Sequence, residues 1–216
     1  MKKGLAISGL LPGIFEGVVD SILFSTKNIN HQRWLITSAL AKEGKTTAAL
    51  GIAVSLSHRG KRVLLLDADL RRHSLSTCVG VNGNVGLAEI VKGEKDLAGG
   101  AQNLDDAGRL YLLGKGNGRI EPFEVLDSSK MQDILTQARS SFDFIIIDSP
   151  ALEEAYDPLF LAPHVEGCLL IVQSERTGKG SIMGAIEKIH QAEGKLLGIV
   201  LNKEQRRMPG FLKRWF

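Results

Sequence analysis

The segment from Arg33 to Thr47 constrains the fold of this chain more than any other. It begins as an apolar run that predicts a buried strand, continues as a loop of small residues, and reaches Gly44-Lys45-Thr46 at the start of a long helical pattern. This order matches the phosphate-binding loop G-x-x-x-x-G-K-[ST], with Ala39 where the first glycine belongs. Backbone N–H groups and the helix N-terminus of such a loop point at phosphate oxygens. We therefore expect a nucleotide site, with Lys45 at the outer phosphates and Thr46 on Mg²⁺.

Two other aliphatic runs end in aspartates. Asp67 and Asp69 follow one run, and Asp148 follows the other. Solidly aliphatic runs predict strands buried on both faces, as in a parallel sheet, and ligands bind open α/β sheets at the carboxyl ends of their strands. Residues one apart in a strand point to the same side, so Asp67 and Asp69 are both placed to face a metal–phosphate site. The alternative, solvated charges at a strand end, is weakened by the phosphate loop.

Strands and helices alternate along the chain, which predicts an α/β fold with a doubly wound, mostly parallel sheet flanked by helices. We divide the chain into an N-terminal segment, 1–32, expected to be helical over Val18 to Phe24; a nucleotide-binding domain, 33–202; and a basic tail, 203–216. Further strands are expected at 109–113, 143–148, 167–172 and 196–201, the last two buried. Helices are expected at 45–57, 84–93, 123–140 and 181–191.

Composition narrows the functional class. The 216 residues, 44% hydrophobic and 24% charged, suit one soluble domain. Cys78 and Cys168 have no metal-ligand or redox spacing. Glu16 and Asp20 interrupt an apolar start that would otherwise imitate a signal peptide, and no apolar run reaches the ~18 residues of a spanning helix, so we expect a cytoplasmic protein.

Charge is concentrated at the C-terminus. The net charge is +3, but the last fourteen residues carry +4, which leaves −1 for the other 202. A general nucleic-acid-binding surface is therefore not expected.

Three motifs stand in fixed order: Ala39 to Thr47, Leu64 to Arg71 and Ile145 to Pro150. Together they resemble the Walker A, A′ and B motifs of the bacterial tyrosine kinases, the ATPases paired with capsule and exopolysaccharide export machines, within the larger group of MinD and ParA. The A′ pattern, three aliphatics followed by D-x-D-x-R, is complete here. The resemblance covers residues 23–202.

The resemblance implies ATP and Mg²⁺ as cofactors and assigns roles to residues. Lys45 would pair with the β- and γ-phosphates. Asp67, with Asp69 close by, would orient or deprotonate the attacking oxygen, and Asp148 would hold Mg²⁺ together with Thr46 and Asp67. Asn202 resembles the position that reads the adenine edge. The loop residues expected to bind nucleotide are Ala39, Leu40, Ala41, Lys42, Glu43, Gly44, Lys45, Thr46 and Thr47.

The chain also departs from the family pattern. It has two tyrosines, Tyr111 in a probable core strand and Tyr156, and none after residue 156, where the family's kinases carry a tyrosine cluster. The family's N-terminal E-x-x-R-x-x-R oligomerisation motif is absent. The loop has Ala41-Lys42 instead of Pro-Gly or Pro-Asp, and Leu40 occupies the position of MinD's signature lysine.

The tail from Pro209 to Phe216 resembles the membrane-targeting sequence of MinD. On a helix, its apolar and aromatic residues would cover one face and Lys213 and Arg214 the other. This combination predicts contact with an anionic membrane surface through Phe211 to Phe216. A tail folded back on the domain, or docked on a protein partner, is the alternative.

The resemblance implies action in exopolysaccharide or capsule synthesis and export, at the inner face of the cell membrane. The implied partner is an inner-membrane polysaccharide co-polymerase or chain-length determinant protein, and we expect a homo-oligomer, at least a transient dimer. Kinase activity toward Tyr156 or a partner is one expectation, and plain ATPase or switch activity is another. A MinD-like membrane-associated switch is the alternative function; a ParA-like DNA-associated ATPase is disfavoured by the −1 charge of the body.

Overall fold

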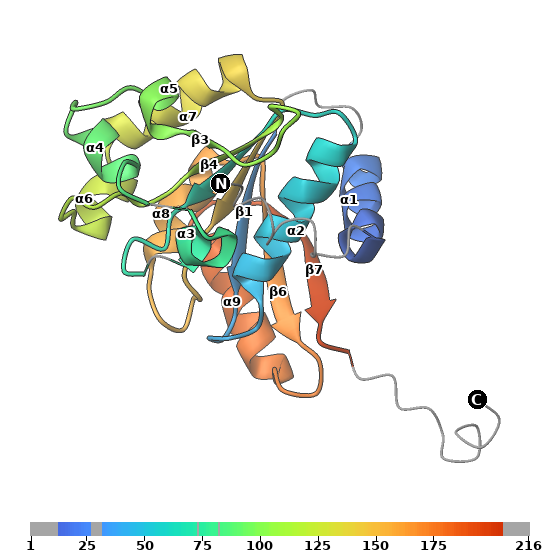
Figure 1. Cartoon of the computed structure of the whole chain (residues 1–216). Helices are drawn as coiled ribbons and strands as arrows, with labels where there is room; N and C mark the ends of the chain where they lie inside the picture. The colour runs from blue at the N-terminus through green and yellow to red at the C-terminus, as the bar shows by residue number, and fades with distance from the viewer. Residues whose placement is uncertain (1–12, 27–31, 73, 82, 205–216) are drawn as a thin grey trace.

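The structure is a computed structural model that describes residues 13–26, 32–72, 74–81 and 83–204. In this part of the chain, seven strands form one sheet in the order β3-β4-β2-β5-β1-β6-β7 (Figure 1). Only the short β3 is antiparallel to its neighbour. The strands are β1 (Gln32–Ser38), β2 (Val63–Asp67), β3 (Gln102–Asn103), β4 (Leu110–Leu113), β5 (Phe144–Asp148), β6 (Gly167–Gln173) and β7 (Leu196–Asn202). The predicted α/β fold with a mostly parallel sheet is confirmed.

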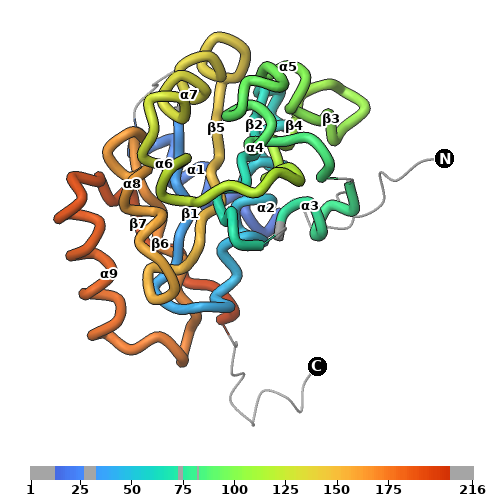
Figure 2. Tube along the Cα trace, turned by 90° about the vertical axis from the view of Figure 1, so that its left-hand side faces the viewer, coloured from blue at the N-terminus to red at the C-terminus, as the bar shows by residue number. Residues whose placement is uncertain are grey.

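Helices cover both faces of this sheet. They are α1 (Gly13–Ser25), α2 (Lys45–His58), α3 (Ser74–Val79), α4 (Leu87–Val91), α5 (Leu97–Gly100), α6 (Pro122–Leu126), α7 (Ser129–Ser141), α8 (Asp157–Leu161) and α9 (Lys179–Gln191), with a 3₁₀ turn at Ala162–His164. Helices α1 and α2 lie side by side on one face (Figure 1), and α7 and α9 lie on the other. Figure 2 views the molecule from the side that carries α6, α8 and α9.

The alternation of side chains along each strand produces two cores. Leu65 and Ile146 pack with α1 and α2, and their strand neighbours Leu64 and Ile147 pack with α7 and α9. Buried residues that point to alternate faces explain why these strands read as continuous aliphatic runs. Trp34 is fully buried in the first core, where its ring meets Phe144 edge to face at 5.2 Å between centroids.

Two expectations are corrected. The single helix expected at 123–140 is two helices, α6 and α7, because the Ser128 side chain accepts the Met131 N–H at 3.2 Å and starts a new helix. The strand expected to be buried at 196–201 is β7, which lies at an edge of the sheet and leaves Ile199 45% and Leu201 56% exposed.

Strand β1 lies where the order of the strands reverses. Its neighbours are β5 on one side and β6 on the other, so the later strands of the sheet are added on both sides of β1. Asp148 pairs in register with Asp67 of β2 and Ile36 of β1. The loop after β1 and both aspartates therefore meet at the edge where open α/β sheets bind ligands.

Gly51 sets the distance between α1 and α2. A Cβ at this position would lie 2.1 Å from Cδ2 of Phe15. We expect Gly51→Ala to lower the free energy of unfolding by about 1–3 kcal/mol because of overpacking, measured by urea denaturation. The matched control is Gly17→Ala, which meets open space on α1 and should gain roughly 0.5–1 kcal/mol from helix propensity. Equal effects of the two substitutions would contradict this packing.

Candidate active site

The phosphate-binding loop, Ala39 to Thr47, connects β1 to α2 at the carboxyl edge of the sheet. Its backbone takes left-handed conformations at Lys42 (φ 64°) and Gly44 (φ 95°). A Cβ on Gly44 would lie 2.2 Å from Nδ2 of Asn202. Glycine is thus required at residue 44 both by backbone conformation and by this close approach.

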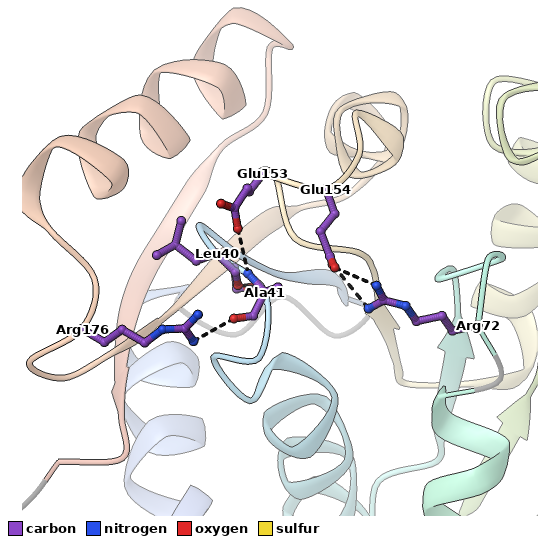
Figure 3. A network of polar contacts seen from close by, with 7 residues as sticks. Leu40, Ala41, Arg72, Glu153, Glu154 and Arg176 are labelled. Atoms are coloured by element: carbon purple, nitrogen blue, oxygen red, sulfur yellow. Dashed lines mark hydrogen bonds and ion pairs between the residues drawn. The ribbon is translucent and has the colours of Figure 1, made fainter.

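The carbonyl groups of the loop all have partners. Each oxygen from Ser38 to Gly44 accepts a hydrogen bond, and the donors come from five segments of the chain. In order, they are Leu152 N (2.9 Å), Glu153 N (3.2 Å), Ser38 Oγ (2.8 Å), Arg176 Nη1 (2.8 Å), Lys203 Nζ (2.7 Å), Asn202 Nδ2 (2.8 Å) and Ala48 N (2.9 Å). Figure 3 shows Arg176 reaching the Ala41 carbonyl.

The N–H groups of the loop are arranged differently. Leu40 N–H donates to Oε2 of Glu43 at 2.7 Å, and Ala41 N–H donates to Oε2 of Glu153 at 3.3 Å (Figure 3). The N–H groups of residues 42–47 have no acceptor among the described residues. Six consecutive free donors at the start of α2, where the helix dipole is positive, form a site for an anion such as phosphate.

Asp67 and Asp148 lie fully buried at the ends of adjacent strands. Asp67 Oδ1 accepts the Asp69 N–H at 3.2 Å, and its Oδ2 accepts the Leu75 N–H at 3.3 Å. Neither oxygen of Asp148 has a hydrogen-bond partner among the described residues. A buried carboxylate is costly when unpartnered, so Asp148 fits a cation, held directly or through water, better than Asp67 does.

Burial also changes the acidity of these carboxyls. Burial, reinforced by the charge of Asp148, raises the pKa of Asp67 to about 8. Burial raises the pKa of Asp148 to about 7, although the neighbouring Thr46 and Lys45 oppose the rise. The pKa of Asp69 is raised by burial as well, against the charge of Lys45. Perturbed carboxyls gathered beside a lysine are typical of active sites.

Two ion pairs connect the segment after β2 to the segment after β5. Arg71 bonds to the buried carboxylate of Asp157, and Arg72 donates to Glu154 at 2.7 Å (Figure 3). They hold the two aspartate-bearing strand ends in a fixed relation to each other.

The structure brings the sequence-predicted site residues together. Lys45 is 7% exposed and lies close enough to Asp69 and Asp148 for its charge to oppose the rise in the pKa of both, and Thr46 adjoins Asp148. Asn202 touches the loop backbone, while its expected role toward adenine stays a prediction. Sequence reasoning missed Gln173, Arg176, Thr177 and Lys203, which contact the loop from distant segments.

Other expectations can be placed as well. Tyr111 is half-buried rather than core, Tyr156 is 66% exposed, Cys78 is exposed and Cys168 is buried.

Among the described residues, no group of three or more His, Cys, Asp or Glu side chains is arranged to hold a metal. No helix within residues 13–26, 32–72, 74–81 and 83–204 combines the length and apolarity needed to span a bilayer. The tail, 205–216, lies outside the described residues.

Comparison with known proteins decides the family. A model described as "AAA domain" matches residues 41–195. The tyrosine-protein kinase YwqD of Bacillus subtilis is 30% identical over 87% of this chain and 79% of its own length. The chain belongs to the bacterial tyrosine kinases.

Two further proteins are similar to this chain, one in sequence and one in fold. The succinoglycan biosynthesis transport protein ExoP of Rhizobium meliloti is 33% identical over 78% of this chain and 22% of its own length. The kinase domain of the Escherichia coli tyrosine kinase ETK superposes with a TM-score of 0.83, at 24% identity, over 90% of this chain and 77% of that domain.

MinD of Pyrococcus horikoshii, solved with Mg-ADP, shares the fold with a TM-score of 0.67 over 85% of this chain and 76% of its own, at 24% identity. The predicted kinase-like P-loop ATPase is confirmed by the family match, and the fold of MinD is shared.

The raised pKa values predict how stability depends on pH. An exposed aspartate titrates near 3.8, whereas folded Asp67 and Asp148 titrate near 8 and 7. Between these values the folded state holds protons that the unfolded state has lost, so their contribution to stability is present below about pH 4 and is lost as the pH rises toward 8. We expect Asp67→Asn and Asp148→Asn to lose less stability than the wild type between pH 5 and 8.5, measured by thermal melting without nucleotide. Asp133→Asn, an exposed control on α7, should keep the wild-type slope.

Proposed function

We propose that this protein binds Mg-ATP at the phosphate-binding loop and transfers the γ-phosphoryl group to a tyrosine hydroxyl. The observation that carries the proposal is the run of free N–H groups at residues 42–47, beside Lys45 and the buried carboxylates. Phosphoryl transfer is chiefly positioning and charge neutralisation, and this arrangement provides both. Membership of the bacterial tyrosine kinase family supports the choice of tyrosine as acceptor.

The proposed roles follow from the chemistry of each side chain. Lys45 pairs with the β- and γ-phosphates, and the free amides hold their oxygens. Thr46 and Asp148 would hold Mg²⁺, which would neutralise negative charge on the phosphates. Asp67, in its ionised form, accepts the proton of the attacking hydroxyl, and burial, which raises its pKa, increases its affinity for that proton. Asp69 orients Lys45, and Asn202 reads the adenine edge.

Tyr156 is the proposed acceptor within this chain. It is 66% exposed, follows the end of β5, and its ring lies 5.5 Å from Nζ of Lys188. Tyr111 is half-buried against Phe142, at 5.4 Å between ring centroids, which disfavours it as an acceptor. In the reaction, the tyrosine oxygen forms the new bond to phosphorus as the bond to the β-phosphate oxygen breaks and ADP leaves.

We place the protein in exopolysaccharide or capsule synthesis and export, at the cytoplasmic face of the inner membrane. The match to ExoP, named for succinoglycan biosynthesis and transport, supports the pathway class. The proposed partner is an inner-membrane polysaccharide co-polymerase or chain-length determinant protein, with Phe211 to Phe216 contacting the membrane and a second copy completing at least a transient dimer. The MinD-like tail favours a second candidate function, a membrane-associated ATP switch that positions partner proteins.

Lys45→Ala tests the nucleotide site. The lysine charge stabilises the negative charge that develops on the phosphoryl group during transfer. Its removal should reduce ATP turnover by about a hundredfold or more, measured as phosphate release and phosphotyrosine formation. Lys61→Ala is the control, since this exposed lysine precedes the amino end of β2, far from the loop. Near-normal turnover by Lys45→Ala would show that the loop assignment is wrong.

Labelled ATP followed by phosphotyrosine mapping tests the acceptor. We expect label on Tyr156, its loss in Tyr156→Phe, and its retention in Tyr111→Phe. Phosphate release without label on any tyrosine, of this chain or of an added co-polymerase partner, would remove the kinase function and leave the ATPase.

Flotation with vesicles containing anionic phospholipid tests the tail. Aromatic insertion and attraction of the basic residues should carry the full chain to the membrane, more strongly with ATP than with ADP if two tails act together. A chain ending at Arg207 should remain in the soluble fraction. Equal membrane binding by the full chain with ATP, the full chain with ADP and the chain ending at Arg207 would rule out the switch function.

A further inference from the structure

Glu43 is an unexpected residue in an anion-binding loop. Its side chain is fully buried, and it forms no ion pair with a basic side chain among the described residues. A buried carboxylate is retained at low cost only when several donors satisfy it. In a loop that must receive phosphate, it also adds a charge of the wrong sign, so its presence calls for a structural reason.

Three donors satisfy this carboxylate. Oε2 accepts the Leu40 N–H within the loop at 2.7 Å, whereas Oε1 accepts the Gln173 N–H at 3.0 Å and the Thr177 hydroxyl. Thr177 Oγ1 also accepts the Gln173 N–H at 3.1 Å. Gln173 ends β6 and Thr177 lies in the turn before α9. Glu43 therefore joins the phosphate loop to a turn 130 residues farther along the chain.

The same turn, together with the end of β7, holds three of the loop carbonyls. Arg176, from the turn, donates to the Ala41 carbonyl at 2.8 Å (Figure 3), and the residues at the end of β7, Asn202 and Lys203, donate to the next two carbonyls. The loop carbonyls are thereby turned to these donors, while the N–H groups of residues 42–47 remain free.

The backbone of the loop requires this restraint. Lys42 has a φ of 64°, a left-handed conformation that a residue with a side chain rarely adopts and that persists only where the surroundings enforce it. Many phosphate loops rely on several glycines to reach their shape, but Gly44 is the one glycine between Ala39 and Thr47. In this loop, contacts from residues outside it hold the backbone in the shape that glycines would otherwise permit.

We propose that Glu43 is a positioning residue of the nucleotide site, and that Gln173 and Thr177 act through it. The carboxylate fixes the loop against the turn before α9, so the amides of residues 42–47 converge on one place. Without this connection the peptide groups of the loop rotate, and carbonyl oxygens that face phosphate would repel it. The proposal rests on the proposed function in one respect, that the loop binds nucleotide phosphates.

Thr177 provides the sharpest test because it lies outside the phosphate loop. Thr177→Val removes the hydroxyl at nearly constant volume, and Thr177→Ser keeps it. Loss of a hydrogen bond to a charged group should weaken binding of a fluorescent ADP analogue with Mg²⁺ about tenfold in Thr177→Val, while Thr177→Ser binds within twofold of the wild type. Glu43→Gln, which offers an amide donor to groups that are themselves donors, should weaken binding at least as much.

General destabilisation is separated from positioning by a stability-matched control. Ser128→Ala removes the N-cap of α7 and should lower the melting temperature without nucleotide, while leaving ADP affinity unchanged. Thr177→Val should instead lose more ADP affinity than a control variant that has the same melting temperature. The proposal fails if Thr177→Val binds like the wild type, if Thr177→Ser is as weak as Thr177→Val, or if Ser128→Ala loses as much affinity. A wild type that binds no ADP would instead overturn the proposed function.

Discussion

Two buried carboxylates at the ends of neighbouring strands are the constraint on which this site depends. Asp67 and Asp148 are paired in register between β2 and β5, and both are removed from water. Carboxylates in such places destabilise the folded chain unless they are protonated or neutralised by a cation. Lys45 and the amides of residues 42–47 concentrate positive potential beside them. A magnesium-bound polyphosphate would match both signs at once, because a cation suits the carboxylates and phosphate oxygens suit the amides.

The phosphate loop shows how a site can be shaped without much glycine. The start of the loop forms hydrogen bonds with the segment after β5, through Leu152 and Glu153. The centre of the loop forms hydrogen bonds with the turn before α9 and with the end of β7. Ion pairs from Arg71 and Arg72 bring the segment after β2 into the same assembly. The geometry of the nucleotide site is consequently a property of the whole carboxyl edge of the sheet rather than of one motif.

Much of this could be predicted from sequence because the informative signals are local. Aliphatic runs that end in aspartates, and the Gly44-Lys45-Thr46 sequence before a helix, fix the central strands and the site edge. The predictions were wrong in two places, one because of a local helix cap and the other because of the position of a strand in the sheet. Ser128 divides an otherwise continuous amphipathic stretch by capping α7, and β7 has the composition of a buried strand but lies at the sheet edge. The partners of Glu43 were missed because they lie more than a hundred residues away, although an acidic residue within an anion-binding loop was itself a signal.

The distances along the chain between the loop and its partners have a consequence for synthesis. Contacts from Asn202 and Lys203 to the loop close 159 and 161 residues of chain, so the loop cannot take its final shape until these two residues have left the ribosome. Long-range contacts of this kind also form slowly. The nascent protein can acquire helices α1 and α2 early, but the loop can bind nucleotide in its final shape only after β7 has been made and has joined the sheet.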